Sequence, residues 1–362
     1  MLWNAARRRS PHWNILVQAV YEPVLNPLKV SIVADKKLLL EITDLQVYFN
    51  IKDNTQWFWQ PAKTLKAVDG MTLNLYQGET LGIVGESGCG KSTLARAIIG
   101  LVKTSGGSVT WLGKNLPSMT ATEWRTVRRD IQMIFQDPVA SLNPRMTIGE
   151  IIAEPLRTYH PQMSRQKMQD NVKAMMLKVG LLSNLINRYP HEFSGGQCQR
   201  IGIARALILQ PKLVICDEPV SALDVSIQAQ VVNLLQKLQQ DMGLSLIFIS
   251  HDLSVVKHIS DRVLVMYLGH TVELGSCDQI YHNPQHPYTK ALMSAMLIPD
   301  PDKERAKKTQ LLAGELPSPI DPPSGCVFHT RCPIATAECV KTRPTLAGNF
   351  RHAVACLKVK ID

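Results

Sequence analysis

Residues 80–101 read TLGIVGESGCGKSTLARAIIGL, and this stretch decides the fold class. Residues 80–84 form an apolar run typical of a buried strand, and residues 94–101 have the apolar content of a helix. Between them, residues 85–93 fit the pattern of a phosphate-binding loop. Glycines let such a loop wrap its backbone N–H groups around phosphates, and the helix N-terminus that follows favours an anion. The stretch therefore predicts a strand, a phosphate-binding loop and a helix within an α/β protein.

The residues of this loop have separable roles. Lys91 is expected to reach the β- and γ-phosphates of a nucleotide, and Ser92 to ligate Mg²⁺. A glycine-rich turn that matches the pattern by chance is the alternative, and the strand and helix on either side argue against it. We expect all nine residues to contact nucleotide: Gly85, Glu86, Ser87, Gly88, Cys89, Gly90, Lys91, Ser92 and Thr93.

A second motif is an apolar run that ends in two carboxylates. Residues 212–216 read KLVIC and are followed by Asp217 and Glu218. Asp217 is placed to hold Mg²⁺, directly or through water, as in other phosphate-loop enzymes. Glu218 is then expected beside the γ-phosphate, where a carboxylate can orient and deprotonate a water molecule. Alone this run is weak, but together with the phosphate loop it predicts nucleotide hydrolysis.

A third motif, residues 193–197, reads FSGGQ and precedes an apolar helix. Ser194 can cap that helix, and the two glycines expose N–H groups that suit an anion. The alternative is a capped helix without a ligand. Here the chain resembles the ABC ATPases, whose signature reads LSGGQ, with Phe193 in place of the leucine. The turn supplies Ser194, Gly195, Gly196 and Gln197 as nucleotide-binding residues.

Other residues match the ABC pattern in the same order. Gln136 resembles the glutamine that senses Mg²⁺ and the γ-phosphate, so that Ser92, Gln136 and Asp217 are the predicted Mg²⁺ ligands. Asp224 resembles the loop that contacts nucleotide and partner across a dimer. His251 resembles the histidine that contacts the γ-phosphate and joins Glu218 as a catalytic residue, although a lone histidine at a strand end is usually structural.

The resemblance implies an ABC-type nucleotide-binding domain of the α/β class. Such domains have a RecA-like core, a helical subdomain and an antiparallel β subdomain. They also stack adenine on an aromatic residue upstream of the phosphate loop. Phe49 is our choice for that residue, with Tyr48, Trp57 and Trp59 as alternatives. The other interpretation is that Phe49 is an ordinary strand aromatic in the core and contacts no nucleotide.

Five further stretches carry a second resemblance. They are QDPVASLNPR at 136–145, RYPHE at 188–192, HPYT at 286–289, SGC at 324–326 and RCP at 331–333. Together they resemble one subfamily, the ATPases of oligopeptide, dipeptide and nickel importers, and above all the F-type oligopeptide subunits. The resemblance implies ATP hydrolysis that drives oligopeptide import. It also implies a second ABC ATPase in a heterodimer, two membrane permease subunits and an extracytoplasmic peptide-binding protein.

Charge and hydropathy bound the location and the partners. The net charge is +10, of which residues 1–37 and 301–362 contribute +4 each. The middle of the chain is therefore close to neutral, whereas nucleic-acid enzymes more often have a basic core, so we expect no nucleic-acid partner. The sequence lacks a long uninterrupted apolar stretch and a clear signal peptide. We expect a peripheral protein on the cytoplasmic face of the inner membrane.

The eight cysteines divide into a scattered set and a C-terminal group. The four of the group are separated by five, six and sixteen residues, and structural zinc sites usually contain a tighter pair. Four cysteines in a loop-rich segment suit a [4Fe–4S] cluster, which some members of the resembling family have. Zinc and free thiols packed in a small apolar appendage are the alternatives. The group is Cys326, Cys332, Cys339 and Cys356.

These features predict three regions. Residues 1–37 are an extension without clear periodicity, residues 38–285 are the ABC ATPase domain, and residues 286–362 are a Pro-rich linker with a small Cys-rich appendage. Two other functions remain as alternatives. A soluble ABC ATPase of translation or DNA repair usually has two cassettes or a long insert, and a non-catalytic binding module would lack residues such as Lys91 and Glu218.

Overall fold

The computed structural model describes residues 37–51, 63–296, 301–307, 312, 314–349 and 351–359. Residues 1–36 of the predicted extension lie outside this set. Trp57 and Trp59, two of the alternatives for the adenine-stacking residue, also lie outside the described residues.

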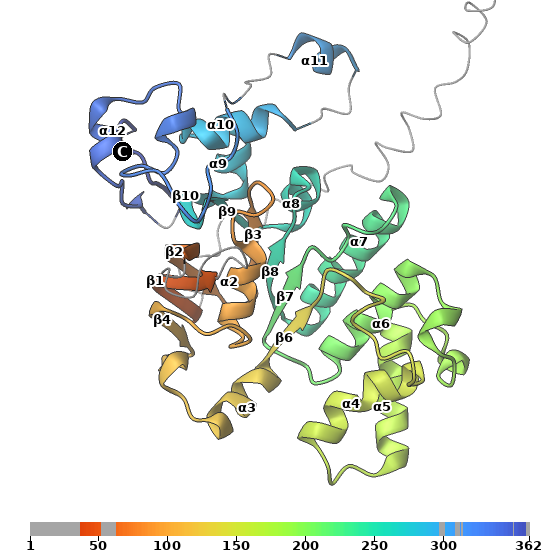
Figure 1. Cartoon of the computed structure of the whole chain (residues 1–362). Coiled ribbons are helices and arrows are strands. Elements are labelled where there is room, and N and C mark those ends of the chain that lie inside the picture. The colour runs from red at the N-terminus through yellow and green to blue at the C-terminus, as the bar shows by residue number, and fades with distance from the viewer. Residues whose placement is uncertain are drawn as a thin grey trace, which may run out of the picture.

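An eight-stranded sheet forms the centre of the molecule (Figure 1). Its order is β11-β12-β10-β9-β3-β8-β7-β6, in which the five strands from β9 to β6 are parallel and the remaining three are antiparallel. The parallel strands are β3 (Thr80–Val84), β6 (Ile131–Ile134), β7 (Leu213–Asp217), β8 (Ser245–Ile249) and β9 (Arg262–Tyr267). The antiparallel strands are β10 (His270–Ser276), β11 (Ala347–Gly348) and β12 (His352–Val354).

A second sheet of four antiparallel strands packs beside the first, in the order β2-β1-β4-β5. The sequence suggests two short strands at 38–42 and 45–49, but the structure has one continuous strand there. Asp44 adopts a positive φ of 49°, and the pairing with β2 shifts register around it. A bulge within one strand therefore lies where the sequence suggests a break between two. The strands are β1 (Leu38–Ile51), β2 (Lys63–Tyr76), β4 (Gly106–Trp111) and β5 (Lys114–Asn115).

The helices cover both faces of the main sheet (Figure 1). Those of the first two thirds of the chain are α2 (Lys91–Ile98), α3 (Ala121–Asp130), α4 (Ile148–Tyr159), α5 (Arg165–Lys178), α6 (Gly195–Leu207) and α7 (Val225–Met242). Those that follow are α8 (Leu253–Ile259), α9 (Cys277–His282), α10 (Pro287–Ser294), α11 (Pro301–Ala306) and α12 (Ala337–Lys341). Short 3₁₀ turns occur at Leu116–Ser118, Ser183–Leu185, Pro190–Glu192 and His329–Arg331. Helices α4 and α5 lie away from the sheet and pack on α6.

Two apolar cores lie on opposite faces of the main sheet. Along β7, Val214 and Cys216 belong to the core beneath α4 to α8, whereas Leu213 and Ile215 belong to the core shared with α2 and the second sheet. This alternation follows from the two-residue period of a strand. Because both faces are covered, β7 reads as a continuous apolar run and delivers its final carboxylate to one edge of the sheet.

The C-terminal segment, defined here as residues 286–359, does not stand apart from the cassette. Its strand β12 pairs with β10, which places it in the main sheet. Phe328 is 1% exposed and packs edge-on to Tyr267 of β9 and Tyr288 of α10. In the part of the chain that the structure describes, no helix is both long and apolar enough to cross a membrane.

Candidate nucleotide site

The phosphate-binding loop joins β3 to α2, and its last residues form the first turn of that helix. Helix α2 begins at Lys91 and ends at Ile98, three residues earlier at both ends than the sequence suggests. Gly90 precedes it with φ of 102°, and a Cβ there would lie 2.0 Å from the carbonyl oxygen of Ala67. Only glycine meets both the left-handed conformation and this close approach.

Lys91 is folded back onto its own loop. Its side chain is 5% exposed, and Nζ donates to the carbonyl oxygens of Gly85 at 2.9 Å and Glu86 at 3.0 Å. An ammonium group held in this way lies at the centre of the loop. It can exchange carbonyl oxygens for phosphate oxygens with little movement.

The predicted Mg²⁺ ligands Ser92 and Asp217 are in contact. Ser92 Oγ donates to Asp217 Oδ1 at 2.8 Å, which joins the start of α2 to the end of β7. Burial raises the pKa of the Asp217 carboxyl, and the hydrogen bond from Ser92 opposes this effect. A hydroxyl and a carboxylate at this separation are the oxygen ligands that Mg²⁺ prefers, so the donor set fits the ion.

Glu218 lies between two other predicted site residues. Its Oε2 accepts a hydrogen bond from Gln136 Nε2 at 2.9 Å and lies 3.4 Å from His251 Nδ1. The backbone of Glu218 has φ of 46°, an uncommon conformation for a residue with a side chain. Its N–H donates to the carbonyl oxygen of Ile249 at 3.0 Å, which holds the turn in place. Such local strain is often found where a side chain must be aimed at a site.

These residues face one cavity of about 590 Å³. The structure therefore brings most of the loop together with Gln136, Glu218 and His251, although they are far apart in sequence. The cavity is lined by Leu65, Ala67, Ser87, Gly88, Gly90, Lys91, Ser92, Thr93, Gln136, Glu218, His251 and Pro319.

The signature turn, residues 194–197, does not line this cavity. Ser194 Oγ accepts from the N–H of Gln197, and the Gln197 side chain accepts from the N–H of Ser194, so the turn caps α6 by itself. A Cβ on Gly196 would lie 2.5 Å from the Ile227 side chain of α7, so glycine allows close packing there. Asp224 is exposed in the same region, where it caps α7 through the N–H of Ile227. The structure thus separates these predicted nucleotide-binding residues from the loop of the same chain.

The predicted adenine-stacking residue lies at the edge of the second sheet. Phe49 is 36% exposed and pairs with Leu65, a residue of the cavity wall. Tyr48 points elsewhere, because its hydroxyl donates to Asp69 Oδ1 at 2.6 Å. Between these two, the geometry favours Phe49.

Sequence reasoning missed residues of the C-terminal segment that reach this site. Pro319 lines the cavity, and its carbonyl oxygen accepts from the N–H of Lys66 at 3.1 Å. Tyr288 and Arg331 both contact Glu86 of the phosphate loop. Both lie in stretches that carry the subfamily resemblance, but nothing in the sequence relates positions about 200 residues away to the loop.

The four C-terminal cysteines line one small cavity of about 10 Å³, together with residues that include His286 and His329. Burial raises the pKa of the Cys326 and Cys332 thiols. Within the described ranges, no three His, Cys, Asp or Glu side chains are close enough together to hold a metal ion. The thiols therefore converge, but they do not form a closed ligand set in this conformation.

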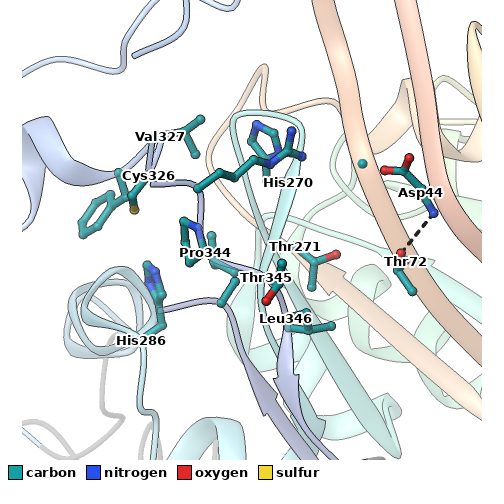
Figure 2. A pocket seen from close by; sticks show the side chains of 15 residues that line it. Asp44, Thr72, His270, Thr271, His286, Cys326, Val327, Pro344, Thr345 and Leu346 are labelled. Atoms are coloured by element: carbon teal, nitrogen blue, oxygen red, sulfur yellow. Dashed lines mark hydrogen bonds between the residues drawn. The ribbon is translucent and has the colours of Figure 1, made fainter. Parts of the chain in front are cut away.

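A larger cavity of about 500 Å³ lies between the C-terminal segment and the second sheet (Figure 2). Cys326 and His286 lie on one side of it, and Asp44 and Thr72 on the other. Burial lowers the pKa of His270, in its wall, to about 4, so that this imidazole is neutral. None of the residues that line the nucleotide cavity also lines this one.

Two family models match the chain. One, described as ABC transporter, matches residues 68–221. The other, described as oligopeptide/dipeptide transporter, C-terminal region, matches residues 272–339.

Individual proteins are similar over almost the whole chain. The oligopeptide transport ATP-binding protein OppF of Salmonella typhimurium strain LT2 is 79% identical over 329 residues, which cover 91% of this chain and 98% of that protein. OppF of Haemophilus influenzae is 67% identical over 90% of this chain and 98% of its own. The dipeptide transport ATP-binding protein DppF of Escherichia coli is 48% identical over 90% of this chain and 95% of its own.

A solved structure has the same fold. It is the dimeric post-hydrolysis state of an ATP-binding cassette bound to ADP and Pi. It matches with a TM-score of 0.59 and 26% identity and covers 66% of this chain and 99% of that one. The comparisons confirm the predicted α/β cassette and do not support a soluble ATPase of translation or DNA repair. The chain therefore belongs to the ABC transporter family, as an ATP-hydrolysing subunit of the OppF type.

Proposed function

We propose that this chain hydrolyses ATP with Glu218 as the general base and so drives the import of oligopeptides. One observation carries the proposal: Glu218 is held between Gln136 and His251 in the same cavity as Lys91 and Ser92. A carboxylate in that position can accept a proton from a water molecule that attacks the γ-phosphorus.

The other residues bind and orient the nucleotide. Lys91 and the loop N–H groups hold the β- and γ-phosphates, and Phe49 stacks on the base. His251 donates a hydrogen bond to the γ-phosphate as charge develops on it. Ser92, Gln136 and Asp217 would hold Mg²⁺, which when bound neutralises phosphate charge.

The signature turn serves the nucleotide of a partner. Ser194, Gly195, Gly196 and Gln197 are exposed or half-buried and lie outside their own chain's cavity, as does Asp224. Two cassettes placed head to tail would present each turn to the other chain's γ-phosphate. ATP would then hold the pair closed, and hydrolysis would release it.

We infer that the partner is a second ABC ATPase, and that two permease subunits and an extracytoplasmic peptide-binding protein complete the importer. The chain would sit on the cytoplasmic face of the inner membrane, bound to the permeases. The high identity to OppF proteins over almost the full length supports this assembly.

Pull-down of a tagged chain from its native membrane tests the assembly. We expect recovery of two permease proteins and a second ATPase in roughly equal amounts, retained when nucleic acid is digested. Recovery of this chain with itself alone, or with ribosomal or DNA-repair proteins, would contradict the proposal.

We further propose that Cys326, Cys332, Cys339 and Cys356 hold a [4Fe–4S] cluster. The support is that all four thiols converge on one cavity and that four thiolates are the ligand set of such a cluster. The cavity holds about one water molecule, so the side chains would have to move apart around the cluster. They would also have to lose their protons.

Purification without oxygen tests this cluster. We expect brown protein that contains iron and acid-labile sulfide, and we expect Cys332→Ser to lose both. Cys277→Ser, which changes a cysteine outside the group, should keep them. Colourless protein, whether it contains zinc or no metal, would overturn the assignment.

For the domains, we propose a cassette over 38–285 and a C-terminal region over 286–362, with 1–37 as a dispensable extension. The family model for the C-terminal region begins earlier, at residue 272. Deletion of 1–37 should leave hydrolysis and assembly intact, and loss of folding would contradict this boundary.

A further inference from the structure

The C-terminal segment forms hydrogen bonds with Glu86 of the phosphate loop. The Arg331 guanidinium donates from one nitrogen to both carboxylate oxygens of Glu86, each at 3.1 Å. The Arg331 side chain is 9% exposed and that of Glu86 28%, so the pair is shielded mainly on the Arg331 side. Charge-assisted hydrogen bonds of this kind are stronger than neutral ones.

The same segment also holds the backbone of Glu86. The N–H of Glu86 donates to the hydroxyl of Tyr288 at 3.0 Å, and Tyr288 is fully buried. Tyr288 packs against Tyr267 and Phe328, and Arg331 lies over the Tyr267 ring at 5.9 Å. Glu86 is therefore fixed at both its main chain and its side chain by a rigid aromatic cluster.

Glu86 is in direct contact with the residue that binds phosphate. Its carbonyl oxygen accepts from Lys91 Nζ at 3.0 Å. A shift of Glu86 would move this acceptor and the loop N–H groups beside it. Pro319 adds a second contact between the segment and the site, since it lines the nucleotide cavity.

The charges of Glu86 and Arg331 also affect how the loop binds an anionic nucleotide. Glu86 places a carboxylate in a loop whose ligand is strongly anionic. Arg331 neutralises this carboxylate within the loop's own environment. Without Arg331, the carboxylate would repel the triphosphate, and the loop would lose an anchor.

We infer that Arg331 is a positioning residue of the nucleotide site, through which the C-terminal segment sets the affinity of the phosphate loop for ATP. It acts through Glu86 and does not touch the reacting atoms. The inference goes beyond the proposed catalytic roles and rests only on ATP binding at the loop.

The test measures the affinity of the full-length chain for a fluorescent ATP analogue, together with KM and kcat of the assembled importer for ATP. We expect Arg331→Ala to weaken binding and raise KM about tenfold, as loss of one partly shielded charge contact does, with kcat changed less than about twofold. Arg331→Lys should restore much of the affinity, because a single nitrogen makes both contacts to Glu86.

A double variant separates charge from packing. Glu86→Gln should raise KM only about twofold, because the substitution removes the repelling carboxylate along with the pair. Arg331→Ala combined with Glu86→Gln should then bind ATP nearly as well as Glu86→Gln alone. The defect of Arg331→Ala should also shrink at high salt, which screens the unpaired carboxylate.

Arg343→Ala is the matched control. Arg343 ties the same segment to Asp69, at 3.5 Å, and to His270, at 2.8 Å, and lines the cavity of Figure 2. It should loosen the segment without raising KM. Unchanged KM in folded Arg331→Ala, or an equal rise in Arg343→Ala, would overturn the inference.

Two outcomes remain distinct from these. If Arg331→Ala does not fold, Arg331→Gln takes its place in the same comparison, and an unchanged KM in folded Arg331→Gln would overturn the inference. Failure of the assembled importer with the wild-type chain to hydrolyse ATP would contradict the proposed function, whereas analogue binding by the chain would still decide the role of Arg331.

Discussion

The two proposed phosphate-binding surfaces differ in how far the chain itself completes them. Around the phosphate loop, Lys91 and Asp217 are almost fully buried, and both are already hydrogen-bonded to residues of the loop. At the signature turn, Ser194 and Gln197 are exposed, and the side chain of each accepts a hydrogen bond from the backbone N–H of the other. The first surface is a pocket, and the second is a capped helix end that faces solvent.

Because of this difference, we expect the two surfaces to act at different steps. The loop side can bind nucleotide in a single chain, since its ligands need no rearrangement from outside. The turn can contribute only when another molecule brings a phosphate to it. Variants on the two sides should therefore separate nucleotide binding from turnover.

The largest effect is expected for Glu218→Gln. The amide keeps the size and hydrogen bonding of the side chain but cannot accept a proton, so turnover should fall at least about a hundredfold. ATP binding should survive, and ATP-bound dimers should accumulate with the proper partner. Phosphate release measures turnover, and Glu123→Gln, at an exposed helix cap, serves as the control. Near-normal hydrolysis in Glu218→Gln would remove Glu218 from its role.

Lys91→Ala should act on binding itself. It removes a buried charge aimed at the phosphates, and we expect nucleotide affinity to fall about a hundredfold. Titration with a fluorescent ATP analogue measures this in the single chain. Lys103→Ala, which changes an exposed lysine outside the cavity, should bind normally. Unaltered affinity in Lys91→Ala would show that the loop does not hold phosphate as proposed.

Ser194→Ala tests the signature turn. The single chain should bind the analogue as the wild type does, whereas turnover in the assembled importer should fall about tenfold. Loss of the cap also costs about 1 kcal/mol of stability, which a thermal melt would reveal. A matching loss of affinity in the isolated chain would mean that the two surfaces are not independent.

The sequence predicted the local structure around the loop, the two carboxylates and the signature turn, because each is a local pattern with a fixed relation to a strand end or a helix start. It also predicted that Gln136, Glu218 and His251 belong to one site, and the geometry brings them together. That proximity follows from parallel strands, whose carboxyl ends share one edge.

The sequence could not predict the contacts of the C-terminal segment, because no local pattern specifies them. Tyr288 and Arg331 meet Glu86 only because the segment folds back along β10, and no periodicity encodes that path. The continuity of β1 is a tertiary effect: the sequence pattern alone suggests two strands, whereas pairing with β2 and β4 continues the strand through a bulge.

A last prediction concerns stability rather than turnover, as a pH dependence that arises at His286. Burial lowers the pKa of this imidazole to about 3, and its Nδ1 accepts the N–H of Tyr288 at the start of α10. The native state excludes a proton that the unfolded chain binds below about pH 6.5. Stability is therefore full above that pH and is lost as the pH falls toward 3, by up to about 1.4 kcal/mol per unit.

Denaturant melts between pH 7 and pH 4.5 would measure this slope. His286→Asn can cap the helix without titrating, so the variant should have a shallower dependence than the wild type. Identical slopes would show that other groups account for the acid sensitivity.

The pairing of β12 with β10 has a consequence for any shortened form of the protein. Strand β10 would become the rim of the main sheet if residues 347–354 were removed, and its outward N–H and C=O groups would lose their partners. An uncovered strand of this kind readily recruits the same strand of another molecule. Chains cut near residue 285 should therefore tend to self-associate and precipitate, whatever the state of the nucleotide site. By covering this edge, the C-terminal segment also keeps the protein soluble.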